Sequence, residues 1–154
     1  MTATAGPSAG TRTVQPSAAS RRRRWLVTPI AVAAAALVNL VIFGIGRLAG
    51  ASFAFTATGI GTTTVEPLTV VGFTAIPLGL GLLLVTLLAP VGRWVVTAAS
   101  IVAPALAVIT IVTMTLPADL DRASTVTLAA CHLALAPISV WAVRRIGSLT
   151  VRTR

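Results

Sequence analysis

Residues 69–116 read TVVGFTAIPLGLGLLLVTLLA, then PVGR, then WVVTAASIVAPALAVITIVTMTL: two long apolar runs separated by a four-residue link. The only charged side chain in this stretch is Arg93, which lies in the link. A helix needs about 20 residues to cross a hydrocarbon core of about 30 Å, and each run is that long. We predict two transmembrane helices, because only a helix pairs every backbone N–H and C=O within one segment. The short link makes them antiparallel neighbours.

Two further apolar runs lie on either side of this pair. Neither contains an acid, and the only arginine within them is Arg47, near the end of the first. The first run is too long for a cleaved signal peptide, whose apolar region has about 7–15 residues, and is interpreted as a retained anchor. The predicted fold is all-α, a four-helix transmembrane bundle of up-down-up-down topology within residues 25–145, with helices at about 25–48, 69–89, 94–116 and 124–143.

The composition excludes an ordinary soluble domain. The chain has 154 residues, of which 56% are hydrophobic and 10% charged, and its mean hydropathy is +0.96. Soluble domains are about a quarter charged. The net charge of +9 comes from arginines that flank the apolar runs instead of forming a basic polar domain. This distribution favours anionic lipid over nucleic acid as the partner of the positive charge.

The arginines also predict the orientation, because cytoplasmic flanks of transmembrane helices carry an excess of positive charge. Ten arginines lie before the first run, in the link or after the fourth run; two, Arg47 and Arg122, lie on the other side with all three acids. Both termini are therefore predicted to be cytosolic, in the plasma membrane. We expect lipid-headgroup contacts from Arg21, Arg22, Arg23, Arg24, Arg93, Arg144 and Arg145. Trp25, Trp94 and Trp141 are expected interface anchors, because an indole there buries its ring and keeps its N–H hydrated.

The segments outside the helices are predicted as follows. Residues 1–24, rich in small and polar residues before an arginine run, form a disordered cytosolic tail, and residues 146–154 form a basic cytosolic tail. The external loop 49–68 lies on the membrane interface through Phe53 and Phe55. Glu66 followed by Pro67 indicates the start of the second helix, because proline is favoured at the first helical position.

The first helix presents a seam of mostly small residues. It consists of residues at alternating spacings of three and four, which share one helical face: Ala36, Asn39, Phe43, Gly46 and Gly50. Small residues let transmembrane helices approach closely. We predict that this seam faces other helices and not lipid.

Polar side chains form two predicted layers within the membrane. At a rise of 1.5 Å per residue, Asn39 and His132 lie at similar depth, which predicts a hydrogen bond between them. Thr86, Ser100 and Ser139 form a second layer nearer the cytosol. These layers are either interhelical hydrogen bonds that set the packing or the lining of a polar pathway. Three intrahelical prolines, which remove backbone hydrogen bonds and favour kinks, would suit the second interpretation: Pro77, Pro104 and Pro137.

The sequence lacks the groups that catalysis needs. It contains no intramembrane carboxylate, no Ser/His/Asp set and no phosphate-binding glycine loop. Asp119 and Asp121 are explained by capping of the fourth helix near Ser124. A zinc site needs three or four ligands, and Cys131, the neighbour of His132, points about 100° away around the helix. We predict a protein that is not an enzyme and has no metal or cofactor.

Several short motifs resemble one family of membrane proteins. They are VEPLTV (65–70), GRW (92–94), ASIVAP (99–104) and CHLA (131–134), followed by Pro137 and the pair Arg144 and Arg145. The chain resembles an uncharacterised family of small four-helix integral membrane proteins from actinobacteria, a domain of unknown function. The resemblance covers about residues 25–145 and implies the fold and the membrane, without an activity or site residues.

Two functional classes remain open after these observations. The first is an interaction or accessory protein of the cell envelope, acting in a complex or as a homo-oligomer; the small-residue seam and the lack of catalytic groups favour it. The alternative is a small oligomeric transporter or permeation subunit with a polar path near Asn39 and His132.

Overall fold

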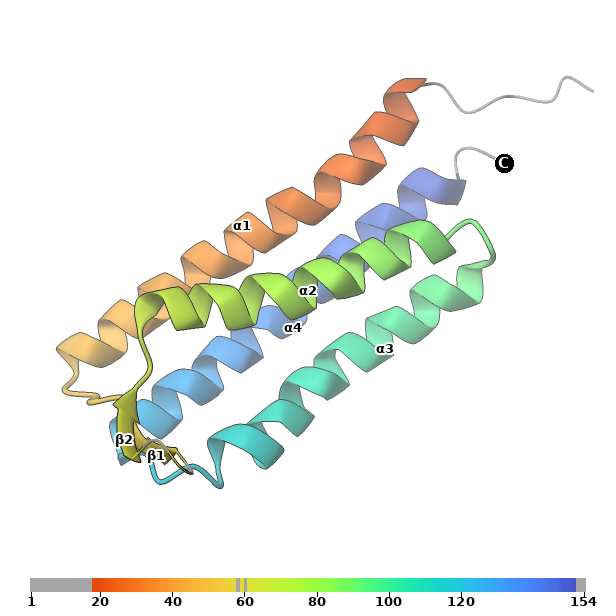
Figure 1. The fold of residues 1–154 in the computed structure, drawn as a ribbon. Helices are drawn as coiled ribbons and strands as arrows, with labels where there is room; N and C mark the ends of the chain where they lie inside the picture. The colour runs from red at the N-terminus through yellow and green to blue at the C-terminus, as the bar shows by residue number, and fades with distance from the viewer. Residues whose placement is uncertain (1–17, 58, 60, 152–154) are drawn as a thin grey trace, which may run out of the picture.

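Four long helices form an antiparallel bundle, which confirms the predicted fold class (Figure 1). The structure is a computed structural model that describes residues 18–57, 59 and 61–151. The helices are α1 (Ala18–Leu48), α2 (Pro67–Leu88), α3 (Arg93–Thr110) and α4 (Arg122–Val151). All four are long and apolar enough to cross a membrane. The start of α1, the α2–α3 link and the end of α4 lie together at what we name the terminal end; the opposite end is the hairpin end.

The outer helices are longer than the apolar runs. α1 begins at Ala18, so Arg21, Arg22, Arg23 and Arg24 belong to a helix and not to a tail ending at residue 24. Similarly, α4 continues to Val151, although a basic tail was predicted from residue 146. Arginine is a good helix former, and neither extension contains proline, although α4 continues through Gly147. Residues 1–17 of the predicted disordered tail, and residues 152–154, lie outside the described residues.

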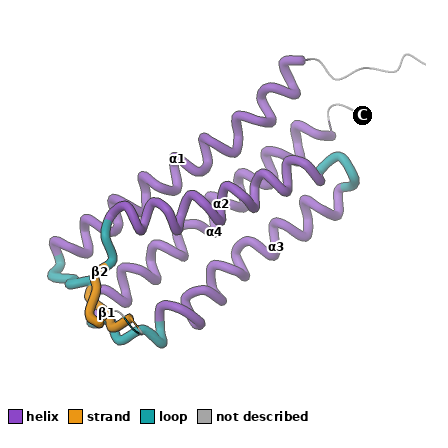
Figure 2. Tube along the Cα trace, viewed as in Figure 1, coloured by secondary structure: helices purple, strands orange, loops and turns teal. Residues whose placement is uncertain are grey.

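The connection between α1 and α2 contains a β-hairpin, which is shown in orange in Figure 2. Strand β1 (Ala54–Ala57) pairs antiparallel with β2 (Gly61–Thr64), from Ala54 opposite Thr64 to Ala57 opposite Gly61. The sequence predicted only a loop here. Strands of four residues are too short for a clear alternating pattern, and this hairpin depends on contacts with the rest of the chain.

Local capping explains where α1 ends and where α2 begins. Gly50 has φ +87°, and the N–H groups of Gly50 and Ala51 donate to the carbonyls of Arg47 and Gly46. These two bonds form a Schellman motif, which satisfies carbonyls left open at the helix end. Glu66 is the N-cap of α2 with Pro67 at the first helical position, as predicted.

α3 ends in a π-helical segment, η1 (Ile111–Thr115), where the Leu116 N–H donates to the Ile111 carbonyl at 2.9 Å. Together the two segments cover the predicted helix 94–116 almost completely. The wider turn is a local change of winding that periodicity in the sequence did not indicate.

The core is built mainly by α1, α2 and α4. α1 packs against α2 and α4, α4 packs against α3, and α2 and α3 make few contacts with each other. One buried cluster lies toward the terminal end and includes Ala31, Leu82 and Val143; a second, at the hairpin end, contains Phe43, Ala51, Phe53 and Val70. Between Arg93 and Thr110, α3 contributes only Val95 and Ala107 as buried residues.

The predicted seam on α1 is partly correct. Asn39, Phe43 and Gly46 are buried, but Ala35 is the buried residue of its turn while Ala36 is half-buried. A Cβ built on Gly46 would lie 2.5 Å from the Thr127 side chain of α4. Gly50 lies beyond the helix end and serves as its cap. The contact surface of α1 therefore follows a spacing of four residues and ends at Gly46.

Candidate functional site

Asn39 bonds to α2 and not to the predicted partner on α4. Its Nδ2 donates to Thr74 Oγ1 at 2.8 Å, and Asn39 is 2% exposed. Its backbone carbonyl accepts a weak bond from the Cys131 thiol at 3.8 Å. The predicted depth of Asn39 beside residues 131 and 132 was right, but the predicted rotation of α4 was wrong by one residue, about 100°.

His132 is half-buried and bonds within its own helix. Its Nδ1 lies 2.8 Å from the Leu128 carbonyl, so the predicted Asn39–His132 hydrogen bond is absent. Cys131 instead occupies the position that faces α1 and is buried. Periodicity placed both residues on the helix but could not decide which one points at α1, because neighbouring positions differ by a single helical step.

The second predicted layer does not bridge helices. The hydroxyls of Thr86, Ser100 and Ser139 donate to carbonyls of their own helices, those of Leu82, Val96 and Ala136. Such bonds remove the need for a partner on another helix. Within the membrane region of the described residues, the Asn39–Thr74 bond thus connects α1 to α2 through two side chains, beside the weak bond from the Cys131 thiol to the Asn39 carbonyl.

Two observations bear on chemistry in this region. Asn39 Oδ1 is buried without a hydrogen-bond partner, which is costly in an apolar interior. Among the residues that the structure describes, no group of three His, Cys, Asp or Glu side chains is close enough to hold a metal ion.

A double-mutant cycle on Asn39→Leu and Thr74→Val should give a coupling free energy of about 0.6–1.7 kcal/mol, the range for hydrogen bonds between transmembrane helices. Unfolding in mixed micelles with increasing anionic detergent measures each free energy. Asn39→Leu combined with His132→Ala is the control and should be additive. Coupling to His132 as strong as coupling to Thr74 would contradict the geometry described here.

The hairpin end holds a polar cluster that the sequence predicted only in part. We name it the hairpin anchor: Asp119, Asp121 and Ser124 with the backbone of Ser52, Phe53 and Thr56. Asp121 Oδ1 accepts the Ser124 N–H at 2.8 Å and so caps α4, as predicted. Its Oδ2 accepts the Ser52 N–H and the hydroxyls of Ser52 and Ser124.

The other two bonds of the hairpin anchor hold the hairpin itself. Asp119, predicted to cap α4, instead accepts the Thr56 N–H of β1 at 2.7 Å. The buried Ser124 hydroxyl accepts the Phe53 N–H at 2.8 Å. The connection from α1 to α2 is therefore tied to the turn between α3 and α4. Local sequence reasoning found the acids and the cap but not these partners, which lie more than 60 residues away along the chain.

The same bonds stabilise the charged form of both carboxylates. Hydrogen bonds from Ser124 and Ser52 hold the pKa of Asp121 well below its usual range, and hydrogen bonds from Thr56 lower the pKa of Asp119. Because these pKa values lie below the unfolded value of about 3.9, the contribution to stability is fully present above about pH 4. It is lost only as the pH falls through the lowered values.

Phe53 connects the hairpin anchor to the apolar core. It has φ +57°, is fully buried, and stacks on Phe43 of α1 with ring centroids 4.2 Å apart. The predicted interfacial position of Phe53 is therefore wrong; Phe55 is half-buried. Arg47 covers both rings, with Cζ 5.5 and 5.3 Å from their centroids. This is cation–π geometry. The Glu66 carboxylate accepts the Thr64 hydroxyl.

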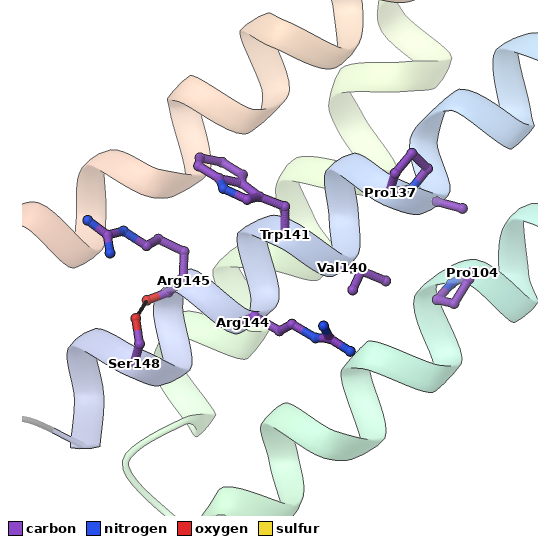
Figure 3. A pocket seen from close by; sticks show the side chains of 8 residues that line it. Pro104, Pro137, Val140, Trp141, Arg144, Arg145 and Ser148 are labelled. Carbon is purple, nitrogen blue, oxygen red and sulfur yellow. Dashed lines mark hydrogen bonds between the residues drawn. The ribbon is translucent and has the colours of Figure 1, made fainter.

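The terminal end gathers the predicted membrane-interface residues. Trp25, Trp94 and Trp141 are exposed, at the end of the bundle where α1 and α3 begin and where the last turns of α4 lie. Arg22, Arg23, Arg93, Arg144 and Arg145 are also exposed there, whereas Glu66, Asp119 and Asp121 all lie at the hairpin end. Trp141, Arg144 and Arg145 border a groove between α3 and α4 (Figure 3).

Comparison with known proteins gives one positive result. Neither the curated proteins nor the solved structures contain a match to this chain. The model of a family of unknown function, DUF6069, matches residues 19–148, which is most of the chain and includes all of α2 and α3 and nearly all of α1 and α4. This chain therefore belongs to the DUF6069 family.

Proposed function

We propose that this protein is a non-catalytic interaction or accessory protein of the cell envelope. The observation that carries the proposal is the hydrogen bonding of the intramembrane polar side chains. Thr86, Ser100 and Ser139 are bonded to their own helices, and Asn39 is bonded to Thr74. The Asn39–Thr74 bond joins α1 to α2, and the other three hydroxyls are satisfied within their own helices. A bundle of this kind acts through its outer surface.

The outer surface available to a partner helix is greatest on α3. Most of its large apolar side chains are exposed, including Ile101, Leu106 and Ile109, and α2 does not cover them. Exposed apolar side chains are normal against lipid, but they also allow a partner helix to pack. The placement of α3 at the edge of the bundle supports this surface as the one that receives a partner.

The proposed setting is the plasma membrane of an actinobacterium, with the terminal end in the cytosol. All three acids at the hairpin end and the arginines at the terminal end support this orientation. The alanine-, valine- and arginine-rich composition without lysine supports the source. Alkaline phosphatase fused after Arg154 should be inactive in cells; strong activity would reverse the orientation.

One observation favours the transporter alternative. Asn39 Oδ1 has no partner among the described residues, and an unpaired acceptor in a bundle interior is a typical feature of a ligand or ion contact. A permeation path would need more than one copy, because the four helices pack around side chains and not around a channel.

Photocrosslinking in native membranes separates the two functions. A photoreactive residue replaces one exposed side chain on each helix in turn: Leu37, Ile76, Ile101 and Leu133. We expect a single foreign protein adduct, strongest from Ile101, with the same mass increment in the intact assembly by native mass spectrometry. Adducts only between copies of this chain would favour the transporter, and lipid adducts alone with a monomeric mass would refute the accessory role.

A further inference from the structure

A groove of about 730 Å³ follows the exposed surface of α4 next to α3. Its inner part is apolar and is lined by Pro104 of α3 with Pro137 and Val140 of α4. Its outer part, toward the terminal end, is lined by Arg144, Arg145 and Ser148. Trp141 lies between the two parts (Figure 3). The groove thus changes from apolar to cationic along the helix axis.

We propose that this groove binds one anionic phospholipid, with an acyl chain against the prolines and Val140 and the phosphate between Arg144 and Arg145. The order of groups along α4 matches the order of groups in such a lipid. From Pro137 to Arg145 the rise is about 12 Å, and the indole N–H of Trp141 lies at the intermediate level of the glycerol and ester oxygens. Guanidinium groups bind phosphate oxygens strongly and in a directed way.

The charge distribution explains why the anion comes from outside the chain. Every acidic side chain of the sequence lies at the hairpin end, on the far side of the membrane from the groove's cationic part. Figure 3 shows Arg144 extending toward α3 and Arg145 to the other side of α4. Neither guanidinium makes an ion pair among the described residues, so both are free to turn toward a phosphate seated between them.

Two other occupants fit the groove less well. A second copy placed symmetrically on this surface would bring its own Arg144 and Arg145 close to the first pair, and like charges in a low-dielectric interface repel. Free phosphate would satisfy the arginines but leave the apolar part of the groove unfilled. A phospholipid satisfies both parts.

The test uses the full chain, delipidated and placed in phosphatidylcholine nanodiscs that contain increasing phosphatidylglycerol. Native mass spectrometry counts the retained lipids. The wild type should retain one phosphatidylglycerol in preference to phosphatidylcholine. Replacing Arg144 and Arg145 by Gln should weaken this retention by roughly tenfold or more, because each arginine near a headgroup contributes about fivefold. Val140→Trp, which fills the apolar part, should also abolish retention while leaving the charge unchanged.

The matched control replaces Arg22 and Arg23, two exposed arginines of the same end on α1, by Gln. Arg22 and Arg23 are expected to contact headgroups of the surrounding bilayer, but they do not line the groove. Their loss should therefore weaken the general preference for anionic lipid and leave the one retained lipid bound to within about threefold. Equal losses in both double variants would show diffuse surface attraction and overturn the site. The proposal would also be overturned if inorganic phosphate stabilised the wild type against thermal unfolding as strongly as the lipid does. A doubled protein mass without bound lipid would overturn it as well. Thermal unfolding confirms that each variant is folded.

Discussion

Phe53→Ala is expected to lower the free energy of unfolding by about 3–5 kcal/mol, the usual cost of removing a fully buried aromatic ring. The phenyl ring has no exposed surface, stacks on Phe43 and lies under the Arg47 guanidinium. Alanine would leave a cavity where the hairpin meets α1. It would also remove one face of the cation–π contact. The measurement is equilibrium unfolding in mixed micelles, followed by circular dichroism.

Phe73→Ala is the matched control, because Phe73 is 71% exposed on α2 and its ring leaves no cavity. It should change the free energy of unfolding by less than about 1 kcal/mol. Ser124→Ala tests the same junction differently: it leaves the buried Phe53 N–H without its acceptor, at a cost of about 1–3 kcal/mol. Equal effects of Phe53→Ala and Phe73→Ala would show that the hairpin does not contribute to the core.

Gly46→Ala should destabilise the bundle by about 1–3 kcal/mol through overpacking, although alanine is the better helix former. The added Cβ would lie 2.5 Å from Thr127 Cγ2 and Oγ1 and 2.9 Å from Thr127 Cβ. Threonine is branched at Cβ and stiff, so the relief must come from separating α1 and α4. Gly46→Leu should have a larger effect of the same sign.

Gly44→Ala is the control two residues away on the same helix, where an added Cβ meets nothing within 4 Å. It should be neutral or stabilising by up to about 1 kcal/mol. Thr127→Ala removes two of the three close contacts, so the double variant with Gly46→Ala should recover part of the lost stability. Destabilisation by Gly44→Ala equal to that of Gly46→Ala would attribute the effect to the helix and not to the α1–α4 contact.

The helices were predictable because length and hydropathy decide them one segment at a time. The run from residue 69 to 89 and the link with Arg93 led directly to α2 and α3. The ends were less predictable: α1 and α4 continue through arginines that are good helix formers but not apolar, so hydropathy gave boundaries inside the true ones. Hydropathy marks the residues that fit the hydrocarbon core of a membrane, and a helix can continue beyond those residues.

The arrangement of polar groups was predictable in depth but not in direction. Rise per residue put Asn39 level with residues 131 and 132, but the rotation of each helix depends on packing against several neighbours at once. Nothing in the sequence distinguishes Thr74, which bonds to Asn39, from a threonine such as Thr86 that bonds to its own backbone. The hairpin anchor was harder still, since Asp119 binds a backbone N–H that any residue could supply.

The hairpin anchor also sets an order of events during synthesis. The bond from Phe53 to Ser124 spans 71 residues of sequence, and at about 5–20 residues per second the ribosome needs about 4–14 s to add them. During that interval α2 and α3 are made, while the N–H groups of Phe53 and Thr56 still lack their acceptors Ser124 and Asp119. The β-hairpin therefore lacks these hydrogen bonds until the start of α4 has been made. A truncated chain that stops before residue 119 would lack them permanently.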